Sequence, residues 1–328
     1  MNLPFPIGYY AAAFAAAGLT TCLALPLWRR VSQRVGLVDD PGHRKIHATP
    51  MPLAGGLAVL TGLALPLLVA VAFIAAGALP GDAFDKLSYG LGKRALQLGA
   101  IVFGAIGMLA LGLADDRFEL KPLLKFAGQC AIAFLVAASG VRVTLFVDNV
   151  LFSYAVTMLW ILTVTNAVNF MDNMNGLCAG IGTIGALHFG ILAAARGQYL
   201  VALLAFLAAG ALAGFLPHNY PKASSFLGDS GSHLVGFLLA VLAILPHFYS
   251  AKAGTSPAAV ISPLFILAVP LADLASVVVL RTSRGIPFWV GDTNHLSHRL
   301  VRAGLGKPAA VALLWLGGVV AGSLCYFL

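Results

Sequence analysis

Charged residues are scarce in this chain. They make up 10% of its 328 residues, and only twelve are acidic. Soluble domains carry roughly 25% charged residues, so the composition excludes an ordinary soluble globule. Cysteine is also rare, and because the four cysteines show no CxxC spacing and lie in or beside apolar runs, neither a disulfide framework nor a zinc site is expected. They are Cys22, Cys130, Cys178 and Cys325.

Apolar sequence is abundant instead. Hydrophobic residues account for 60% of the chain, and its mean hydropathy is +0.92. Continuous apolar runs of about 20 residues recur, the length that a helix needs to cross roughly 30 Å of hydrocarbon, and their continuity favours helices over barrel strands. We predict an all-α polytopic membrane protein, one domain over residues 1–328, with about ten transmembrane helices. They are expected near residues 9–28, 53–79, 96–113, 123–140, 151–165, 177–195, 200–215, 233–249, 258–280 and 309–327.

Basic residues are distributed unequally between the two predicted faces. With both termini outside, fourteen of the twenty Lys and Arg residues fall on one side, which the positive-inside rule identifies as cytoplasmic. Most acids fall on the same side, so the polar chemistry is expected there, on cytoplasmic loops. The net charge of +8 is explained by orientation and by anionic lipid or phosphate rather than by nucleic acid. The six cations assigned to the outer side are Lys86, Lys93, Arg94, Arg142, Arg196 and Lys252.

An acidic pair ends one apolar run. Asp115 and Asp116 are followed by Arg117, Lys121 and Lys125. The two carboxylates could coordinate Mg²⁺ or take a proton while the lysines, four residues apart and so on one helix face, meet phosphate. Capping of a helix and snorkelling of the lysines would give the same pattern. The residues alone leave both interpretations open.

A second inner segment is rich in asparagine. Asn166, Asn169, Asp172 and Asn175 recur at every third position. In a helix this spacing aligns the four side chains along one edge, whereas a break at Asn175–Gly176 would let them line a polar pocket. Polar groups packed between apolar spans usually mark a functional site.

Two further inner segments carry candidate ligands. Asp229 lies in a turn rich in glycine and serine, where it could join a metal site or only cap a helix. His295 and His298, with Arg299 beside them, could grip a pyrophosphate. A zinc site is the competing interpretation, but no HExxH pattern or nearby cysteine supports it.

The remaining candidates are the first inner loop and one acid within a span. The loop offers Arg44, Lys45 and His47 as phosphate donors, although a basic stop-transfer loop would look the same. Asp273 lies inside a predicted span, so we expect it to be functional or paired with a nearby cation such as Arg281.

In chain order these segments read RKxH…PxxGG, DD with a following lysine, NxxNxxD, FxGDxGS and HxxHRL. From about residue 39 to residue 300, this order resembles the polyprenyl-phosphate N-acetylhexosamine-1-phosphate transferases of glycosyltransferase family 4, which are related to the phospho-MurNAc-pentapeptide translocase. The resemblance implies transfer of a sugar-1-phosphate, GlcNAc-1-phosphate being expected, from a UDP-N-acetylhexosamine to undecaprenyl phosphate in the bacterial inner membrane, with release of UMP. It implies Mg²⁺ as cofactor, with Mn²⁺ as an ion that could substitute.

The resemblance also implies roles for individual residues. Asp229 would be the principal Mg²⁺ ligand, and Asp115 and Asp116 would position or deprotonate the lipid phosphate. Phe226 would lie against uracil. The implied substrate-binding residues are Arg44, Lys45, His47, Lys125, Asn166, Asn169, Asp172, Asn175, Asn219, Phe226, His295, His298 and Arg299.

Two motifs depart from the pattern of the family. Where many members have DGxDGL, this chain reads Asp172-Asn173-Met174-Asn175-Gly176-Leu177, and where HxHHRL is common, Ser297 replaces the central histidine. Either departure could alter the choice of donor. The absence of three consecutive histidines favours a UDP-N-acetylhexosamine over UDP-MurNAc-pentapeptide.

Two other interpretations remain at this stage. A secondary transporter could use Asp172, Asp229 and Asp273 along an ion pathway, but it should show inverted repeats, and none is visible in the sequence. A relative that kept the fold without catalysis would have no need for three inner carboxylates. Whether the protein forms a homodimer is left open.

Overall fold

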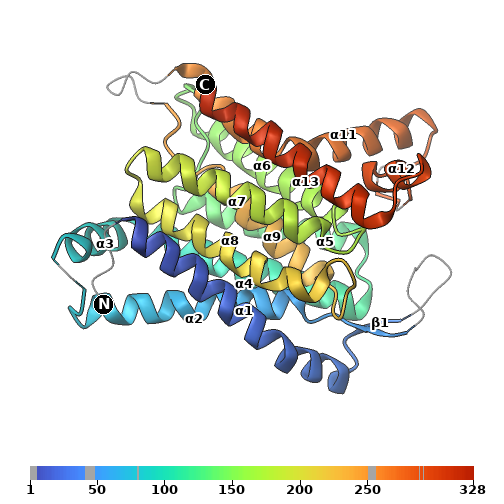
Figure 1. Cartoon of the computed structure of the whole chain (residues 1–328). Coiled ribbons are helices and arrows are strands. Elements are labelled where there is room, and N and C mark those ends of the chain that lie inside the picture. Colours follow the sequence, from blue (N-terminus) through green and yellow to red (C-terminus); the bar gives the residue numbers. More distant parts are fainter. Residues whose placement is uncertain (1–5, 41–48, 80, 250–255, 288, 291) are drawn as a thin grey trace.

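The computed structural model describes residues 6–40, 49–79, 81–249, 256–287, 289–290 and 292–328, whose regular secondary structure is almost entirely helical (Figure 1). The prediction of an all-α protein is confirmed. The helices are α1 (Ile7–Val35), α2 (Gly55–Ala75), α3 (Gly81–Lys93), α4 (Ala95–Phe118), α5 (Pro122–Ala138), α6 (Val150–Phe170), α7 (Leu177–Ala195), α8 (Tyr199–Asn219), α9 (Gly228–Leu242), α10 (Ser262–Ile266), α11 (Ala268–Ser283), α12 (Leu296–Arg302) and α13 (Lys307–Ser323), with 3-10 helices at Pro257–Ile261 and Leu324–Phe327 and two short strands, β1 (Val38–Asp39) and β2 (Met51–Pro52).

Every predicted span coincides with a helix or with a bent pair of helices. Within the described part of the chain, seven helices are long and apolar enough to cross a membrane: α1, α2, α4, α6, α7, α8 and α13 with its 3-10 extension. Helices α5 and α9 are apolar but have only 17 and 15 residues. The chain is a multi-pass membrane protein.

The prediction of one continuous helix over residues 258–280 is wrong. The segment Pro257–Ile266 and α11 meet at a bend of 71°. Pro270 explains the bend, because proline has no N–H to donate to the carbonyl of Ile266 four residues earlier and its ring crowds that carbonyl. Helix α3 was also not predicted as a helix, since its mixed polar and apolar residues give no continuous apolar run.

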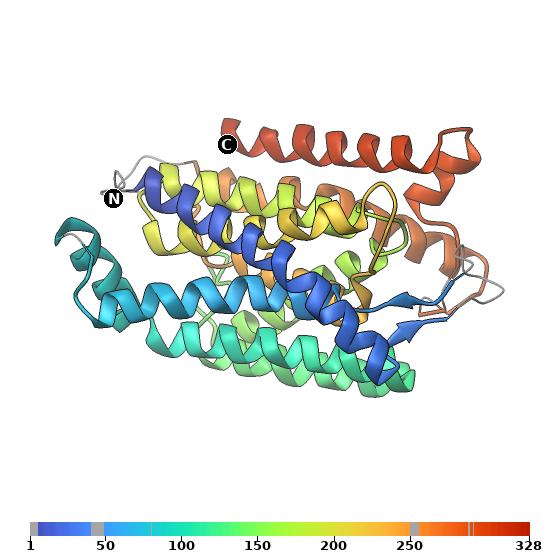
Figure 2. The ribbon, with the colours of Figure 1, turned by 60° about the horizontal axis from the view of Figure 1, so that its bottom comes forward.

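The two ends of the bundle differ in content. In Figure 1, α1 begins at the left beside α3 and α13 ends at the top, left of centre, whereas β1 and α12 lie at the right. Figure 2 shows α13 along one side of the bundle and α4 along the opposite side, with α1 crossing obliquely. We call the right-hand end of Figure 1 the strand end and the left-hand end the α3 end.

Helix α9 is the centre of the bundle. Thirteen of its fifteen residues are buried, and it packs against α2, α4, α6 and α7. At 1.5 Å per residue it is only about 22 Å long, shorter than the roughly 30 Å of bilayer hydrocarbon. Because neighbouring helices surround it, this helix does not have to span the bilayer by itself. A Cβ at Gly112 of α4 would overlap the backbone of Asp229 and Ser230. This glycine lets α4 approach the first turn of α9, and Asp116 follows one turn later on the same face.

Candidate active site

Three helix ends bring a lysine between two carboxylates. Asp115 lies in the last turn of α4, Lys125 in the first turn of α5 and Asp229 in the first turn of α9. The Nζ atom of Lys125 lies 2.6 Å from Oδ2 of Asp115 and 2.7 Å from Oδ2 of Asp229. We call Asp115, Lys125 and Asp229 the carboxylate–lysine cluster. The side chain of Asp229 is 34% exposed, against 12% for Asp115, so solutes can reach the cluster from the side of Asp229.

Asp116 has a different role from that of its neighbour. Its carboxylate accepts hydrogen bonds from the backbone N–H groups of Asp229, at 2.8 Å, and Ser230, at 3.0 Å. First-turn N–H groups of a helix have no partner within the helix, and the positive end of the helix dipole favours an anion there. Asp116 therefore caps α9 and fixes the backbone that carries Asp229.

The C-terminal end of α6 supplies amides to the same region. Nδ2 of Asn169 donates to Oδ1 of Asp229 and to Oγ of Ser232, both at 2.8 Å. Asn169 and Lys125 thus each engage one carboxylate oxygen of Asp229. Asn166, one turn earlier, donates to Oε1 of Gln129 at 2.8 Å, so its amide joins α6 to α5.

Asp172 lies just beyond the end of α6 and is half-buried. Burial, followed by the negative charges of Asp229 and Asp116, raises its pKa to about 8, against the opposing effect of a hydrogen bond from the Gly228 backbone. The protonated form therefore predominates at pH 7, and Asp172 can donate a hydrogen bond that an ionised carboxylate could not.

Replacing Asp172 with asparagine is expected to stabilise the protein, and more so at pH 8 than at pH 5. An acid whose pKa is about 8 in the fold and 3.8 in its ordinary state opposes folding increasingly as pH rises through that window, whereas asparagine does not titrate. Thermal unfolding of both forms at the two pH values measures the difference in Tm. A difference that does not change with pH would show that Asp172 is not the titrating group.

The turn between α6 and α7 is held by Asn219. This buried side chain accepts from the backbone N–H of Gly176 at 2.6 Å and donates to the carbonyl of Ser225 at 2.9 Å. Gly176 has a φ of 78°, which glycine adopts without strain. Asn175 donates to the carbonyl of Pro221 at 3.3 Å. Asn219 therefore positions two site segments through their backbones, and its amide is already used.

Phe226 joins the first inner segment to the segment that carries Asp229. Its backbone N–H donates to the carbonyl of Pro52, and its carbonyl accepts from Gly55, both at 3.0 Å. A parallel bridge with Leu53 completes the contact. The segments that the motif order singled out thus meet here. The predicted phosphate ligands Arg44, Lys45 and His47 lie outside the described residues.

Helix α12 carries His298, His295 directly precedes it, and a buried acid holds the start of this helix. The carboxylate of Asp273 lies 2.7 Å from Nδ1 of His295 and accepts from the backbone N–H of Leu296 at 2.6 Å. Asp273 was expected to be functional or to pair with a nearby cation such as Arg281, and of these the pairing with Arg281 is wrong. Arg281 lies eight residues further along α11, about 12 Å along the axis, and instead makes a two-point contact with Asp292 at 3.1 and 3.2 Å.

His298 and Arg299 lie on the outer part of α12. The rings of His295 and His298 have centroids 6.4 Å apart. Burial, then electrostatic interactions with His295 and Arg302, lower the pKa of His298, which favours its neutral imidazole at pH 7. Arg299 is exposed, and no ion pair involves it within the described part of the chain. Its guanidinium is open to an anion.

Residues 169–176, at the end of α6 and in the turn after it, connect the carboxylate–lysine cluster to α12. The ring of Phe170 packs edge-to-face against His295, with centroids 5.4 Å apart, and lies 5.3 Å from the guanidinium of Arg281. Oδ1 of Asn173 accepts from the hydroxyl of Ser297 at 2.6 Å. Because Asn169 reaches Asp229, one short segment positions both parts of the site.

Sequence reasoning missed two contributors to this arrangement. Gln129, 1% exposed, holds Asn166, and a lone glutamine in an apolar span was the available signal. The ring of the buried His233 contacts the carbonyl of Asp229 through Nδ1. That contact joins two residues one turn apart, so it could have been inferred only once α9 was known to begin before Asp229.

The donor set suits a magnesium ion that arrives with its substrate. Among the described residues, no three or more His, Cys, Asp or Glu side chains form a ready metal-binding group. Mg²⁺, however, is usually held by one or two carboxylates together with waters and substrate phosphates. Asp229 and Asp115 provide two such carboxylates, and the ammonium of Lys125 bridges them as a cation would. These residues fit the ion once the ammonium of Lys125 moves away from one of the two carboxylates.

Comparison with known proteins identifies the family that this chain matches. Residues 98–247 match the family model described as "Glycosyl transferase family 4". The chain is 33% identical over 345 residues to the decaprenyl-phosphate N-acetylglucosaminephosphotransferase of Mycobacterium tuberculosis, covering 97% of this chain and 82% of that protein.

Two further relatives agree. The "Probable undecaprenyl-phosphate N-acetylglucosaminyl 1-phosphate transferase" of Bacillus subtilis is 29% identical over 316 residues, 94% of this chain and 82% of the relative. The undecaprenyl-phosphate alpha-N-acetylglucosaminyl 1-phosphate transferase of Escherichia coli is 26% identical over 322 residues, which cover 93% of this chain and 80% of the relative. The resemblance inferred from the motifs is confirmed: the chain belongs to glycosyl transferase family 4, among the polyprenyl-phosphate sugar-phosphate transferases.

Proposed function

We propose that this protein transfers N-acetylglucosamine-1-phosphate from UDP-N-acetylglucosamine to undecaprenyl phosphate, as the first membrane step of a cell-envelope polysaccharide. The observation that carries the proposal is the carboxylate–lysine cluster at one end of the helices, next to α12, which follows His295 and carries His298 and the exposed Arg299. The excess of basic residues on that side supports a cytoplasmic orientation in the inner membrane. The names of the relatives support N-acetylglucosamine as the sugar.

The reaction is a displacement at phosphorus. An oxygen of the lipid phosphate attacks the phosphorus attached to the sugar, a new P–O bond forms, and the P–O bond to UMP breaks. Such a transfer needs alignment and neutralisation of charge more than covalent help from the protein. Lys125 and Arg299 would bind phosphate oxygens, Asp116 fixes the first turn of α9, and Asp273 orients His295.

A divalent ion completes this scheme. Asp229, with Asp115 as a second ligand, would hold Mg²⁺, which neutralises phosphate charge when bound. Asp115 also contacts the ammonium of Lys125 at 2.6 Å. An ammonium displaced from Asp229 would therefore stay beside Asp115, where it would bind a substrate phosphate. The half-buried, protonated Asp172 can donate a hydrogen bond to the nucleotide or to the leaving phosphate.

The other interpretations have less support. For a transporter, Asp273 should line a pathway, but this acid is fully buried and is engaged by His295 and Leu296. A UDP-MurNAc-pentapeptide donor remains an alternative within the family, against which the names of the matched relatives argue.

A panel of donors tests the sugar. Membranes containing the protein are incubated with radiolabelled UDP-GlcNAc, UDP-GalNAc or UDP-MurNAc-pentapeptide, and label in the organic-soluble lipid fraction is counted. We expect label from UDP-GlcNAc above that from membranes lacking the protein. Label from UDP-MurNAc-pentapeptide alone would replace the proposed donor with the alternative.

The two departures from the family pattern are expected to be coupled. Ser297 is fully buried and donates to Asn173, so Ser297→His should overpack this contact at a cost of about 1–3 kcal/mol. Adding Asn173→Gly removes the obstructing side chain and should recover part of the loss. Thermal unfolding of the two single variants and the double variant gives the coupling, and the donor panel shows whether preference changes. Strictly additive losses would mean that the two positions act independently.

A further inference from the structure

A basic cavity opens at the α3 end, away from the carboxylate–lysine cluster. It has a volume of about 920 Å³ and is lined by α3, the start of α4, residues 140–146, the start of α8 and residues 243–249. Four cations line it, and none of its described lining residues is acidic. The four are Lys86, Lys93, Arg94 and Arg142.

Aromatic rings accompany these cations. Lys93 donates to the hydroxyl of Tyr89 at 3.1 Å, and its ammonium lies 5.4 Å from the centroid of that ring. The guanidinium of Arg142 lies 5.4 Å from the ring centroid of Tyr154. A ring holds a cation without cancelling its charge. The nearby acids Asp85 and Asp148 are exposed and do not line the cavity.

The location of this charge is itself unusual. The positive-inside rule depletes short outer loops of Lys and Arg, and the sequence assigns only six cations to this side. Four of those six line one cavity. Orientation in the membrane does not explain such clustering, whereas an anionic ligand does.

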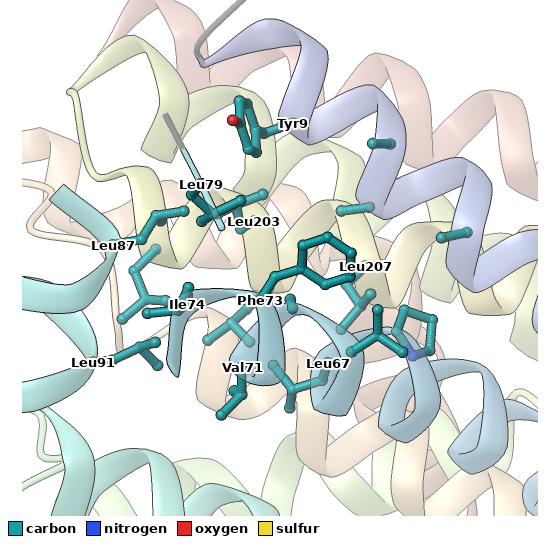
Figure 3. A pocket seen from close by; sticks show the side chains of 18 of the residues that line it. Tyr9, Leu67, Val71, Phe73, Ile74, Leu79, Leu87, Leu91, Leu203 and Leu207 are labelled. Carbon is teal, nitrogen blue, oxygen red and sulfur yellow. The ribbon is translucent and has the colours of Figure 1, made fainter. Parts of the chain in front are cut away.

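An apolar cavity adjoins the basic one. It has a volume of about 420 Å³ and lies between α1, α2, α3 and α8. Figure 3 shows Leu87 and Leu91 of α3 and Leu203 of α8 around it. Leu200 and Leu204, one turn apart on α8, line both cavities. The amphipathic α3 thus presents leucines to one cavity and lysines to the other.

We propose that the two cavities together bind an anionic phospholipid, with its phosphate among Lys93, Arg94 and Arg142 and one acyl chain between α2, α3 and α8. Charge complementarity selects the headgroup, and the continuity through Leu200 and Leu204 lets one molecule occupy both cavities. This site is separate from the transferase site and does not depend on the proposed donor.

Thermal unfolding of the full-length protein, stripped of lipid in detergent, tests the site. Phosphatidylglycerol, phosphatidylcholine and inorganic phosphate are each added in separate titrations. We expect phosphatidylglycerol to raise Tm at concentrations where the other two do not. The midpoint is the phosphatidylglycerol concentration that gives half of the full rise in Tm. In the Lys93→Gln/Arg142→Gln double variant this midpoint should rise roughly 10- to 30-fold, since each cation near an anionic lipid contributes about a factor of five in affinity.

Two controls separate the parts of the site. Arg284→Gln removes an exposed cation outside both cavities and should leave the midpoint unchanged, whereas Ala70→Phe fills the apolar cavity and should raise it. Equal shifts from phosphatidylcholine would overturn the headgroup assignment, and equal shifts from inorganic phosphate would overturn the lipid. Retention of the full response by the double variant would overturn the site.

Discussion

The Asp229→Ala variant is expected to lose transferase activity by roughly 10²- to 10³-fold, the scale seen when a preorganised electrostatic group is removed from an active site. Asp229 is the more exposed carboxylate of the carboxylate–lysine cluster, and Asn169, Lys125 and the capped first turn of α9 orient it. Its loss removes the proposed principal ligand of the metal. Activity is measured as lipid-linked sugar formed per unit of inserted protein.

Asp148→Ala is the matched control for this variant. Asp148 is an exposed acid in the segment between α5 and α6, so its removal changes net charge equally without touching the cluster, and full activity is expected. If Asp229→Ala inserts normally and retains substantial turnover, Asp229 is not the metal ligand.

Lys125→Ala is expected to reduce kcat/KM by roughly 100-fold, an effect of about 2.7 kcal/mol. Removal of the ammonium leaves the carboxylates of Asp115 and Asp229 without the cation between them and removes one proposed phosphate ligand. Loss of one partner from a shielded ion pair costs more than the net worth of the pair, because the remaining charges are left uncompensated. Steady-state kinetics in both substrates measure the effect.

Two further variants make this result specific. Lys125→Arg keeps the charge and should recover part of the activity. Lys121→Ala removes an exposed lysine one turn earlier, which makes no ion pair within the described residues, and should have little effect. Unchanged kinetics for Lys125→Ala would reduce this residue to a membrane anchor.

Local patterns in the sequence identified the helices and the segments of the site. Continuous apolar runs have a single low-energy arrangement in a bilayer, a hydrogen-bonded helix, so the spans could be predicted. The helix ends could not, because contacts between segments decide them: α4 continues through Asp115 and Asp116, and α9 begins at Gly228 rather than near residue 233. Asp115, Asp116 and Asp229 therefore lie in terminal turns of helices and not in loops.

The choice of partners depends on the tertiary structure. Proximity along the chain suggested Asp273 with Arg281, yet the segment that precedes α12 brings His295 to Asp273 and Asp292 to Arg281. Ser297 and Asn173 stood out only as separate departures from a pattern, and the fold places them in contact. The amphipathic α3 gave no apolar run, so the lipid cavities that it borders could not be predicted either.

The central claim is that this chain joins a sugar phosphate to a lipid phosphate with the help of a divalent ion at the carboxylate–lysine cluster. It is tested most directly by UMP release from UDP-GlcNAc, using purified protein in detergent with undecaprenyl phosphate and Mg²⁺. We predict release that requires the lipid, is abolished by EDTA and returns with added Mg²⁺ or Mn²⁺. Release that continues in EDTA, or that occurs without the lipid, would contradict the claim.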